Sequence, residues 1–372
     1  MDPRPKRFPK ISIIVPAYNE GKTIKRTIQS LLSLNYSKRL LEILVIDDGS
    51  KDDTFEIAKK FPQIKSFTKK NGGKGSAINL GLKKATGEFV AIMDADSFVS
   101  KHMLKRMIGY FENEKVMAVT PTLKVHSPKG FLQRFQYIEY LISVILKKIF
   151  SYIGGIYVTP GPFSIYRALF FKKHGGFDEN NLTEDMEIAL RIQHKGYEIE
   201  NSINAVVTTV APNNFKALLH QRMRWYTGMI ENVWAYRSLF GAHTGNLGVF
   251  VMPVMALSIA MSLTYLIYYG TSIFSNVWHN IYQVYLVGFD LDVVTRSLQN
   301  LSLINLINPF SVLVVLMITF MLTILALAKI YSKDKANLPG TTLLYIFIYG
   351  PISGFWWITT VLYKVLRLQV KW

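Results

Sequence analysis

The stretch Phe89-Val90-Ala91-Ile92-Met93-Asp94-Ala95-Asp96 decides the fold. It consists of five apolar residues followed by two aspartates, Asp94 and Asp96. The apolar run predicts a buried strand, and the aspartates fall where that strand ends in a loop. Side chains two positions apart in an extended chain point to the same side, so Asp94 and Asp96 face one space beyond the strand, where open α/β sheets bind ligands. Their hard oxygen atoms would hold Mg²⁺ or Mn²⁺ and leave metal positions open for phosphate oxygens. In the alternative interpretation, Asp96 or Ser97 caps a helix that begins near Lys101.

The stretch belongs to a region of alternating strand and helix patterns, from residue 11 to residue 121. Short apolar runs alternate with segments of helical periodicity, which predicts an α/β fold with a parallel, doubly wound sheet. The predicted strands are Ile11–Val15, Leu41–Ile46, Ile64–Phe67, Phe89–Met93 and Val116–Thr120. The predicted helices are Lys22–Leu34, Thr54–Phe61, Gly75–Lys84 and Met103–Phe111. Acidic clusters at 18–20, 47–50 and 94–96 follow three of the strands, so we expect them to converge on one edge of the sheet.

Four further elements are predicted between residues 132 and 237. Leu132–Ile153 mixes aromatic, aliphatic and lysine residues, a pattern typical of an amphipathic helix that lies either near a membrane surface or against the domain. Thr159–Tyr166 is predicted as a strand and Thr183–His194 as a helix. Asn214–Arg237 is predicted as a basic, aromatic helix that leads into an apolar segment.

Composition limits the classes of protein to which the chain can belong. Cysteine is absent, which excludes disulfides, thiolate metal sites and cysteine nucleophiles. The net charge is +18, and residues after about 240 hold only seven Lys or Arg and three Asp or Glu, so the preceding region carries most of the excess. A positive field favours anionic partners such as nucleic acid, an acidic membrane or a phosphorylated substrate. The scattered basic residues and the apolar C-terminal third argue against nucleic acid.

Three uncharged apolar segments in the C-terminal third are long enough to cross the roughly 30 Å hydrocarbon layer of a membrane. They are Leu247–Gly270, Asn305–Ala328 and Leu338–Tyr363. Thr271–Leu303 is too polar for a simple span, and Gly350-Pro351 is expected to break the last segment. The basic start of the chain shows no signal-peptide pattern, so the positive-inside rule places the N-terminal region in the cytoplasm of a multi-pass protein of the cell membrane. The side on which the C-terminus lies is left open.

Five short motifs occur in order along residues 10–230. They are Val15-Pro16-Ala17-Tyr18-Asn19-Glu20, Asp47-Asp48-Gly49-Ser50, Asp94-Ala95-Asp96, Thr183-Glu184-Asp185 and Gln221-Arg222-Met223-Arg224-Trp225. With these motifs the sequence resembles the family 2 glycosyltransferases, and within them the branch of the cellulose, chitin and hyaluronan synthases. The resemblance implies a GT-A-type doubly wound mixed sheet, a nucleotide-sugar donor and a divalent cation. It also implies a cytosolic catalytic domain over 1–212, an interfacial helix segment over 213–245 and a transmembrane domain of about three spans over 246–372.

The resemblance assigns the first two motifs to the nucleoside of the donor. Pro16, Ala17, Tyr18 and Glu20 match the first motif, with Tyr18 available for stacking, and Asp48 is the expected partner of a base N–H group. Read alone, Asp-Asp-Gly-Ser is also a good turn sequence, so the second motif has a structural explanation as well.

A glycine-rich loop, residues 70–77, leads into the predicted helix at Gly75. Its glycines allow close backbone approach, Lys74 offers positive charge for a phosphate, and the following helix N-terminus favours anions. The segment from Lys74 to Asn79 is similar to a lysine- and asparagine-containing segment of the synthases. A flexible loop with a solvated lysine is the alternative. The resemblance further implies that Asp94 and Asp96 bind a metal ion that bridges the donor diphosphate.

The resemblance assigns the last two motifs to the acceptor side. It implies that Asp185, with Glu184 beside it, is the general base that takes a proton from the acceptor hydroxyl during one in-line displacement that inverts configuration. It implies that Gln221 and Arg224 address the acceptor and the diphosphate, and that Trp225 gives a platform for the acceptor sugar.

Simpler explanations exist for these segments when they are read without the resemblance. Thr183 would cap a helix whose first turn holds two carboxylates. Residues 221–225 would suit a basic, aromatic helix at a membrane interface. One more segment, Gly161–Arg167, is similar to a segment that borders the acceptor site of hyaluronan and chitin synthases.

Two departures separate the sequence from those synthases. No Phe-x-Val-Thr-x-Lys segment follows the apolar segments, and no transmembrane helix is expected before the first strand. Three spans are also few for a polysaccharide channel. We therefore expect an inverting transferase that moves a hexose to a polyprenyl- or dolichyl-linked glycan at the cytoplasmic face of the membrane. By analogy with small lipid-directed members of the family, GDP-mannose is slightly favoured over UDP-sugars as the donor. The alternatives are a processive β-glycan synthase that uses a UDP-sugar, a polyprenyl-phosphate mannose synthase, and a catalytically silent nucleotide-binding scaffold.

Overall fold

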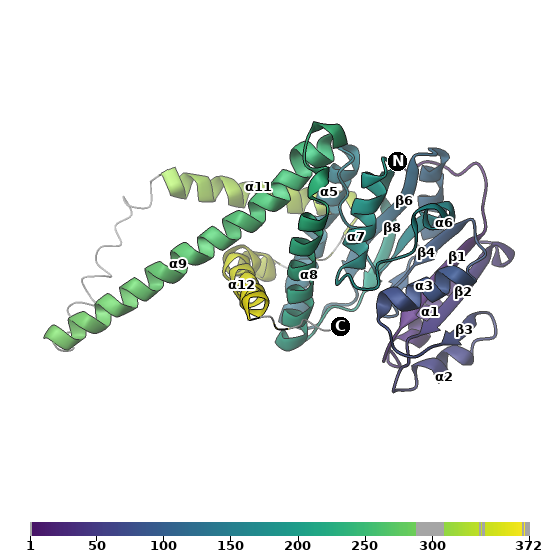
Figure 1. Cartoon of the computed structure of the whole chain (residues 1–372), viewed down its shortest axis with the longest axis horizontal. Helices are drawn as coiled ribbons and strands as arrows, with labels where there is room; N and C mark the ends of the chain where they lie inside the picture. Colours follow the sequence, from purple (N-terminus) through teal and green to yellow (C-terminus); the bar gives the residue numbers. More distant parts are fainter. Residues whose placement is uncertain (1, 288–308, 335, 337–338, 367, 369–372) are drawn as a thin grey trace.

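An eight-stranded sheet lies at one end of the molecule, and long helices extend from the other end (Figure 1). The computed structural model describes residues 2–287, 309–334, 336, 339–366 and 368. The order of the strands across the sheet is β3-β2-β1-β4-β7-β6-β8-β5. This sheet is the frame on which the motif residues are arranged.

The N-terminal half of the sheet is parallel, as predicted. It consists of β1 (Ile11–Ala17), β2 (Leu41–Asp47), β3 (Lys65–Thr68) and β4 (Phe89–Ile92). β1 pairs in parallel with both β2 and β4, so the strand order changes direction beside β1. Open sheets bind ligands in the crevice at such a switch point, beyond the carboxyl ends of the strands. Asp94 follows β4 at this place.

The second half of the sheet is mixed. β7 (Ser164–Arg167) runs antiparallel between β4 and β6 (Val116–Val125), and β8 (Glu198–Thr209) runs parallel to β6. β5 (Ser97–Val99) pairs antiparallel with β8 at the edge. The mixed sheet implied by the resemblance is therefore confirmed, whereas the parallel sheet expected from the apolar pattern holds only for the first half. Apolar patterns identify strands but not their neighbours, so they do not show that β7 inserts between β4 and β6.

Three observed elements lie outside the predicted ones: β5, β8 and α6 (Ala168–His174). β8 alternates apolar residues with glutamate, asparagine and serine, and β5 has only three residues, so neither forms a clear apolar run. β5 begins at Ser97, and the helix that follows, α4 (Met103–Met107), is preceded by His102. The alternative in which Asp96 or Ser97 caps that helix is therefore wrong.

Helices cover both faces of the sheet, because successive side chains of a strand point to opposite faces. Besides α4 and α6, the helices that cover the sheet are α1 (Ile24–Leu32), α2 (Thr54–Lys59), α3 (Lys74–Lys84) and α7 (Glu184–His194). Ile13 of β1 belongs to the apolar cluster formed with α1, α2 and α4. Its neighbour Ile14 belongs to the cluster formed with α3, α6 and α7. The predicted helices of this region are confirmed, with slightly displaced ends.

Two long helices, α5 (Phe131–Tyr152) and α8 (Phe215–Ala235), stand between the sheet and the C-terminal helices (Figure 1). Both agree with the predicted ranges. α5 packs against β6 and β8 on one side and against α11 (Pro309–Tyr331) on the other. Of the two interpretations of this segment, the one that places it against the domain is therefore confirmed.

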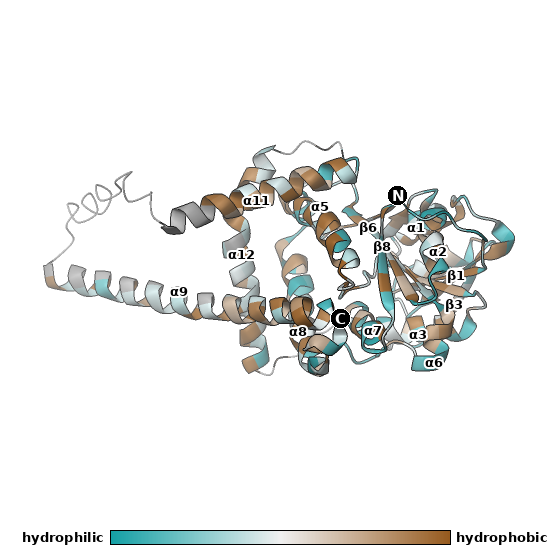
Figure 2. Cartoon of the chain, turned by 90° about the horizontal axis from the view of Figure 1, so that it is seen from above, coloured by the Kyte–Doolittle hydropathy of each residue, from teal (hydrophilic) through white to brown (hydrophobic). Residues whose placement is uncertain are grey.

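Apolar helices follow α8 in the C-terminal third. α9 (Met252–Val287) projects away from the sheet, and α11 returns toward it; Figure 2 shows apolar residues along α11 and along the first part of α9. Among the described residues, Leu247–Thr264 is one helical segment long and apolar enough to cross a membrane, and α12 (Pro339–Val365) adds a second if its two arms form one span. Residues 288–308, which hold the start of the second predicted span and much of the polar segment, lie outside the described residues.

α12 is bent by 46° at Pro351, in agreement with the predicted break. Both of its arms contact the long helices next to the sheet. The Tyr345 ring lies 4.7 Å from the ring of Phe135 on α5. The Trp357 ring stacks 4.5 Å from the ring of Tyr226 on α8. α12 therefore runs along α5 and α8 instead of leaving them.

Candidate active site

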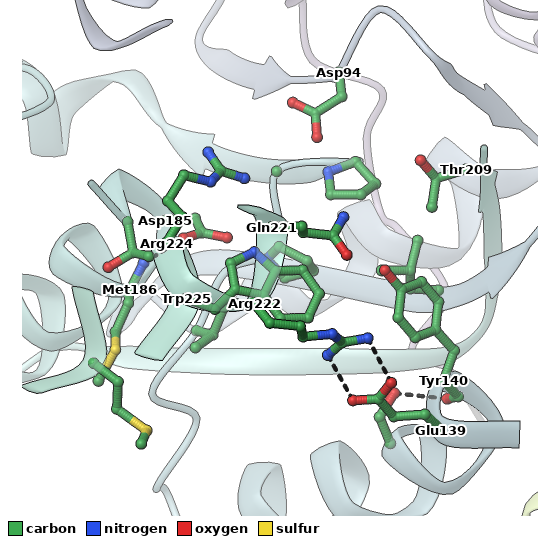
Figure 3. A pocket seen from close by; sticks show the side chains of 18 of the residues that line it. Asp94, Glu139, Tyr140, Asp185, Met186, Thr209, Gln221, Arg222, Arg224 and Trp225 are labelled. Atoms are coloured by element: carbon green, nitrogen blue, oxygen red, sulfur yellow. Dashed lines mark hydrogen bonds and ion pairs between the residues drawn. The ribbon is translucent and has the colours of Figure 1, made fainter. Parts of the chain in front are cut away.

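A cavity of about 490 Å³ lies beyond the carboxyl end of β4, between the sheet and helices α5, α7 and α8. Residues 156–158 and 160–162, together with Tyr349 of α12, complete its wall. Figure 3 shows the side chains of Asp185, Gln221, Arg224 and Trp225 grouped near Asp94. The sequence-predicted residues that line the cavity are Lys74, Asp94, Asp96, Glu184, Asp185, Gln221, Arg224 and Trp225. Motifs that are far apart in the sequence thus meet in one cavity.

Lys74 is the centre of a charge network on the sheet side of the cavity. Its Nζ lies 2.7 Å from Oδ1 of Asp94 and 2.8 Å from Oε1 of Glu184. Only 18% of the Lys74 side chain and 4% of the Glu184 side chain are exposed. Burial opposes the charged form of Lys74, but the carboxylates of Asp94, Glu184 and Asp185 outweigh burial and raise the Lys74 pKa. The alternative of a solvated lysine in a flexible loop is therefore wrong.

Gly161 allows residues 160–162 to lie directly over these charges. A Cβ atom at Gly161 would lie 2.6 Å from Nζ of Lys74 and 2.9 Å from Oδ2 of Asp94. The Gly161 carbonyl oxygen accepts a 3.1 Å hydrogen bond from the backbone N–H of Asp94. A larger residue would displace the ion pair, so this close approach requires glycine. The strand predicted over Thr159–Tyr166 begins only at Ser164, because the residues before it form this loop.

Asp96 lies beside Asp94 and accepts hydrogen bonds of 3.1 Å from Oγ of Ser97 and from Oγ1 of Thr209. Burial, followed by the negative charges of Asp94 and Glu20, raises the Asp96 pKa to about 7. Carboxylates that repel one another in this way fit a bound cation, and their hard oxygen atoms suit Mg²⁺ or Mn²⁺. Within the described residues, no three His, Asp or Glu side chains are placed to hold one ion together, so water and substrate oxygens would supply the other ligands.

Asp185 is in the first turn of α7 and faces the same cavity. Its carboxylate accepts a 2.9 Å hydrogen bond from the backbone N–H of Met186. Burial, followed by the charge of Glu184, raises the Asp185 pKa to about 6, although Lys74 and Arg224 act in the opposite direction. A carboxylate with a pKa close to neutrality is suited to accepting a proton at pH 7.

Thr183 precedes α7, but its side chain does not cap the helix as the simpler explanation proposes. Its hydroxyl oxygen accepts a 2.9 Å hydrogen bond from Nδ2 of Asn232 on α8. Gly228, also on α8, faces Thr183 so closely that a Cβ atom there would overlap the threonine side chain. α7 and α8 therefore meet at this point, which sets the position of Asp185 relative to Trp225.

Gln221 presents an unpaired oxygen atom at the cavity. Its Oε1 is buried and, in the part of the chain that the structure describes, has no hydrogen-bond partner. Buried polar atoms in folded proteins are nearly always hydrogen-bonded, so this exception points to a ligand group that completes the site. A hydroxyl group bound in the cavity would satisfy the Gln221 oxygen.

Trp225 is positioned by an ion pair that the motif assignment leaves out. Nη1 and Nη2 of Arg222 lie 2.7 Å and 2.6 Å from the two carboxylate oxygens of Glu139 on α5 (Figure 3). The Arg222 guanidinium also lies over the Trp225 ring, 4.4 Å from its centroid. A two-bond pair of this kind fixes orientation as well as distance. Because α5 and α8 together hold Trp225 at the cavity, the segment is more than an interfacial helix.

The residues predicted to bind the nucleoside lie outside the cavity lining. Pro16 and Ala17 end β1, and Tyr18 follows with 43% of its surface exposed, which leaves its ring accessible for stacking. Glu20 is close enough to the metal-site aspartates for its charge to raise the Asp96 pKa. Contacts of these residues with a nucleoside stay a prediction.

Asp48 organises the glycine-rich loop. Its carboxylate accepts a 2.7 Å hydrogen bond from Nζ of Lys69 and a 2.8 Å hydrogen bond from the backbone N–H of Gly73. Gly49 adopts a positive φ of 74°, which accounts for the turn-like character of this motif. The structural explanation is thus correct, and the contact of Asp48 with a base stays a prediction beside it.

Several residues of the cavity wall belong to no predicted motif, among them Glu139 and Lys147 on α5 and Tyr349 on α12. Glu139 and Lys147 are two helical turns apart, so spacing alone shows that they share a face. No local pattern shows that this face turns toward the cavity. Tyr349 lies in an apolar segment and carries no signal of its own.

The mixed sheet, with an aspartate pair at its switch point, has a GT-A-type fold. Residues 12–175 match the family described as Glycosyl transferase family 2. The match covers less than half of the chain. It shows a family 2 glycosyltransferase domain in residues 12–175, as the motif resemblance implied, and this domain supports an enzyme.

Named relatives agree with this assignment. The chain is 32% identical over 236 residues to the poly-beta-1,6-N-acetyl-D-glucosamine synthase of Staphylococcus epidermidis, an alignment that covers 60% of this chain and 57% of the relative. It is 32% identical over 239 residues to the probable glycosyltransferase YdaM of Bacillus subtilis (strain 168), which covers 60% of this chain and 56% of the relative. The chain thus spans a little over half the length of these curated relatives.

A solved structure has the same fold over nearly the whole chain. The mannosyltransferase PcManGT from Pyrobaculum calidifontis, in complex with GDP-Man and Mn2+, aligns over 99% of this chain and 90% of that chain, with a TM-score of 0.61 and 18% sequence identity. At this level of identity the likeness concerns the fold alone.

Proposed function

We propose that the chain is an inverting glycosyltransferase that transfers a sugar from a nucleotide sugar to a lipid-linked glycan at the cytoplasmic face of a membrane, with Mg²⁺ or Mn²⁺ as cofactor. The observation that carries this proposal is the cavity that Asp185 shares with Lys74, Asp94 and Asp96. Charges suited to a diphosphate and a carboxylate suited to accepting a proton line the same space, which is what a single displacement at the anomeric carbon requires.

Asp94 and Asp96 would hold the cation, whose charge would stabilise the leaving diphosphate. Asp185 accepts the proton of the acceptor hydroxyl while the hydroxyl oxygen forms a bond to the anomeric carbon. The bond from that carbon to the diphosphate oxygen breaks on the opposite face, so the configuration inverts. Lys74 and Arg224 place positive charge near the group that leaves.

The acceptor sugar is assigned to the helix side of the cavity. The Trp225 ring offers a flat apolar surface on which a sugar can stack. The unpaired Oε1 of Gln221 accepts a hydrogen bond from a sugar hydroxyl, which supports the same placement. Glu184 acts through Lys74, since its carboxylate forms an ion pair with that residue.

The membrane is assigned to the C-terminal helices. Their large apolar side chains are exposed on α9, α11 and α12, for example at Leu257, Phe274, Phe320, Phe347 and Leu362. Helices that are apolar on several sides suit contact with lipid. The proposal therefore divides the chain into a catalytic domain over 1–212, an interfacial helix segment over 213–245 and a transmembrane domain over 246–372. It places the protein in the cell membrane as a multi-pass protein, with the catalytic domain in the cytoplasm.

Two kinds of donor compete in this proposal. The analogy with small lipid-directed members of family 2 slightly favours GDP-mannose, whereas the name of the Staphylococcus epidermidis relative favours a UDP-sugar. A thermal-shift panel with GDP-mannose, UDP-glucose and UDP-N-acetylglucosamine in the presence of Mn²⁺ separates them, because a ligand that binds the folded state raises Tm according to its occupancy. The relative's name also supports a second candidate, a processive β-glycan synthase. Product length measured by mass spectrometry separates a polymer from a single addition.

The test of the enzymatic assignment is Asp185→Asn. We expect the rate of transfer to fall by roughly 10³-fold, since the general base is lost, while the metal-dependent binding of the nucleotide sugar is retained. Asp178→Asn, at an exposed carboxylate in the loop before α7, is the matched control. Equal rates for Asp185→Asn and the unaltered protein would overturn the assignment of the base. Donor binding with no transfer by the unaltered protein would identify a silent scaffold.

A further inference from the structure

Lys147 is a charged residue of the cavity that the proposed mechanism does not use. It lies on the face of α5 that lines the cavity, in the same row as Glu139, Ser143 and Phe150. Within the described residues, its ammonium group forms no ion pair or hydrogen bond. Lys147 is half-buried, and a cation that lines a cavity without an ion pair in the protein is a candidate for binding an anionic ligand.

The electrostatic surroundings of Lys147 leave its charge available for a ligand. Burial lowers the Lys147 pKa to about 8, and Asp185 is the group whose charge opposes this effect. The cations that act on the Asp185 pKa, however, are two others, Lys74 and Arg224. Glu139, one of the carboxylates on the same face, is occupied by its two bonds to Arg222. Each acidic neighbour of Lys147 thus has another positive partner.

The cavity wall next to Lys147 continues into the first apolar helix. Phe150, Tyr157 and Met229 line the cavity and also pack against the residues that begin the segment Leu247–Thr264. This segment is long and apolar enough to cross a membrane. A lipid tail that lies along the helix would therefore reach the cavity at the wall that holds Lys147.

We propose that Lys147 is a specificity-determining residue that binds a phosphate group of the acceptor, so that the acceptor sugar is joined to its lipid through phosphate. The inference rests on the proposed function and names the acceptor class for the same site. A lysine ammonium binds phosphate as a point charge, which a neutral glycan or glycolipid would leave unbalanced. Asp185 and Lys147 share one cavity, so the phosphate lies close to the reacting hydroxyl.

Lys148 provides a matched control in the same helix. Its Nζ donates a 3.0 Å hydrogen bond to the carbonyl oxygen of Asn201, and it lies 4.7 Å from the centroid of the Tyr152 ring. Lys148 is not part of the cavity lining. Lys147→Met and Lys148→Met each remove one charge from α5, but only the first removes a charge from the cavity.

The test is the binding of three probes to the full chain in detergent: farnesyl-diphospho-N-acetylglucosamine, N-acetylglucosamine 1-phosphate and the neutral octyl N-acetylglucosaminide. We expect the unaltered protein to bind the farnesyl probe about tenfold or more tightly than the neutral probe. Lys147→Met should abolish this preference, whereas Lys147→Arg and Lys148→Met should keep it. Tighter binding of the farnesyl probe than of the soluble phosphate supports a lipid-linked source, and equal binding of the two overturns that part of the proposal.

Other outcomes would also overturn the assignment. They are a Lys147→Met variant that still prefers the phosphorylated probes, and a Lys148→Met variant that loses the preference to the same extent. Lys147→Gln, compared by thermal unfolding, replaces Lys147→Met if the methionine variant does not fold. Binding of the probes needs no donor, so a protein that transfers no sugar would count against the proposed function and leave the test of Lys147 valid.

Discussion

Two lysines on different walls of one cavity have opposite environments. Lys74, on the wall formed by α3 and β4, contacts the carboxylates of Asp94 and Glu184, and its pKa is raised. Lys147, on the wall formed by α5, contacts no carboxylate among the described residues, and its pKa is lowered. The charge of Lys74 is thus balanced within the protein, whereas the charge of Lys147 would be balanced by the proposed ligand. Variants on the two walls should differ accordingly.

The largest effect is expected from Lys74→Met on the sheet wall. The variant leaves Glu184 buried without its cation, which should lower the free energy of unfolding by about 3 kcal/mol. It also removes positive charge from the diphosphate site, so we expect transfer to fall by about 100-fold or more. Urea unfolding and initial rates measure the two effects separately.

The double variant Lys74→Met/Glu184→Gln sharpens this result. It removes the unpaired carboxylate together with the lysine, so most of the lost stability should return while transfer stays low. A double variant that regains both stability and transfer would show that Lys74 acts only through the fold.

Trp225→Ala tests the helix wall. Loss of the ring would leave roughly 80 Å² of apolar sugar surface uncovered, worth about 2 kcal/mol, so the KM for the acceptor should rise about 30-fold. The KM for the donor should not change, because Lys74 and Asp94 are untouched. Steady-state kinetics with each substrate varied in turn provide the measurement. An equal rise in both KM values would contradict the separation of the two walls.

The pH dependence of kcat/KM tests the role of the Asp185 carboxylate, which lines the same cavity as both lysines. The Asp185 pKa is raised to about 6, and only the charged form accepts a proton, so kcat/KM is retained above this pH and lost below it. We expect a value about tenfold lower at pH 5 than at pH 7. Lys74 lowers the Asp185 pKa, so Lys74→Met should move the acid limb to higher pH, and Lys148→Met should leave it in place. If the acid limb lies at the same pH in the unaltered protein, Lys74→Met and Lys148→Met, then protonation of Asp185 does not cause it.

The smallest effect is expected outside the cavity, at Lys364→Ala. Nζ of Lys364 on α12 lies 3.2 Å from Oε1 of Glu231 on α8, and both side chains are nearly half exposed. Exposed ion pairs contribute about 0.5 kcal/mol or less, so Tm and transfer should change little. A large loss of transfer would show that the attachment of α12 depends on this pair and not on its ring contacts.

The elements of the fold could be predicted where a strand is mostly apolar. β1, β2 and β4 are such strands, because they are buried on both faces of the sheet. β8 could not be predicted in the same way, since its polar residues break the apolar run. The position of β7 between β4 and β6 depends on contacts between distant segments, which no local pattern reports.

The site could be predicted where its residues belong to short motifs. Asp94, Asp185 and Trp225 come from three such motifs and line one cavity. Lys147 and Tyr349 could not be predicted, because a helix can present any of its faces to a cavity and the choice depends on tertiary packing.

Tyr349 makes the last helix part of the working enzyme. A chain shortened before α12 would keep every motif and the whole sheet, yet it would lose one side of the substrate chamber and uncover the rings of Phe135 and Tyr226. We expect such a truncated protein to bind nucleotide sugar without turning it over. Protease cleavage that releases α12 would then abolish the proposed transfer while the donor-binding portion stays folded.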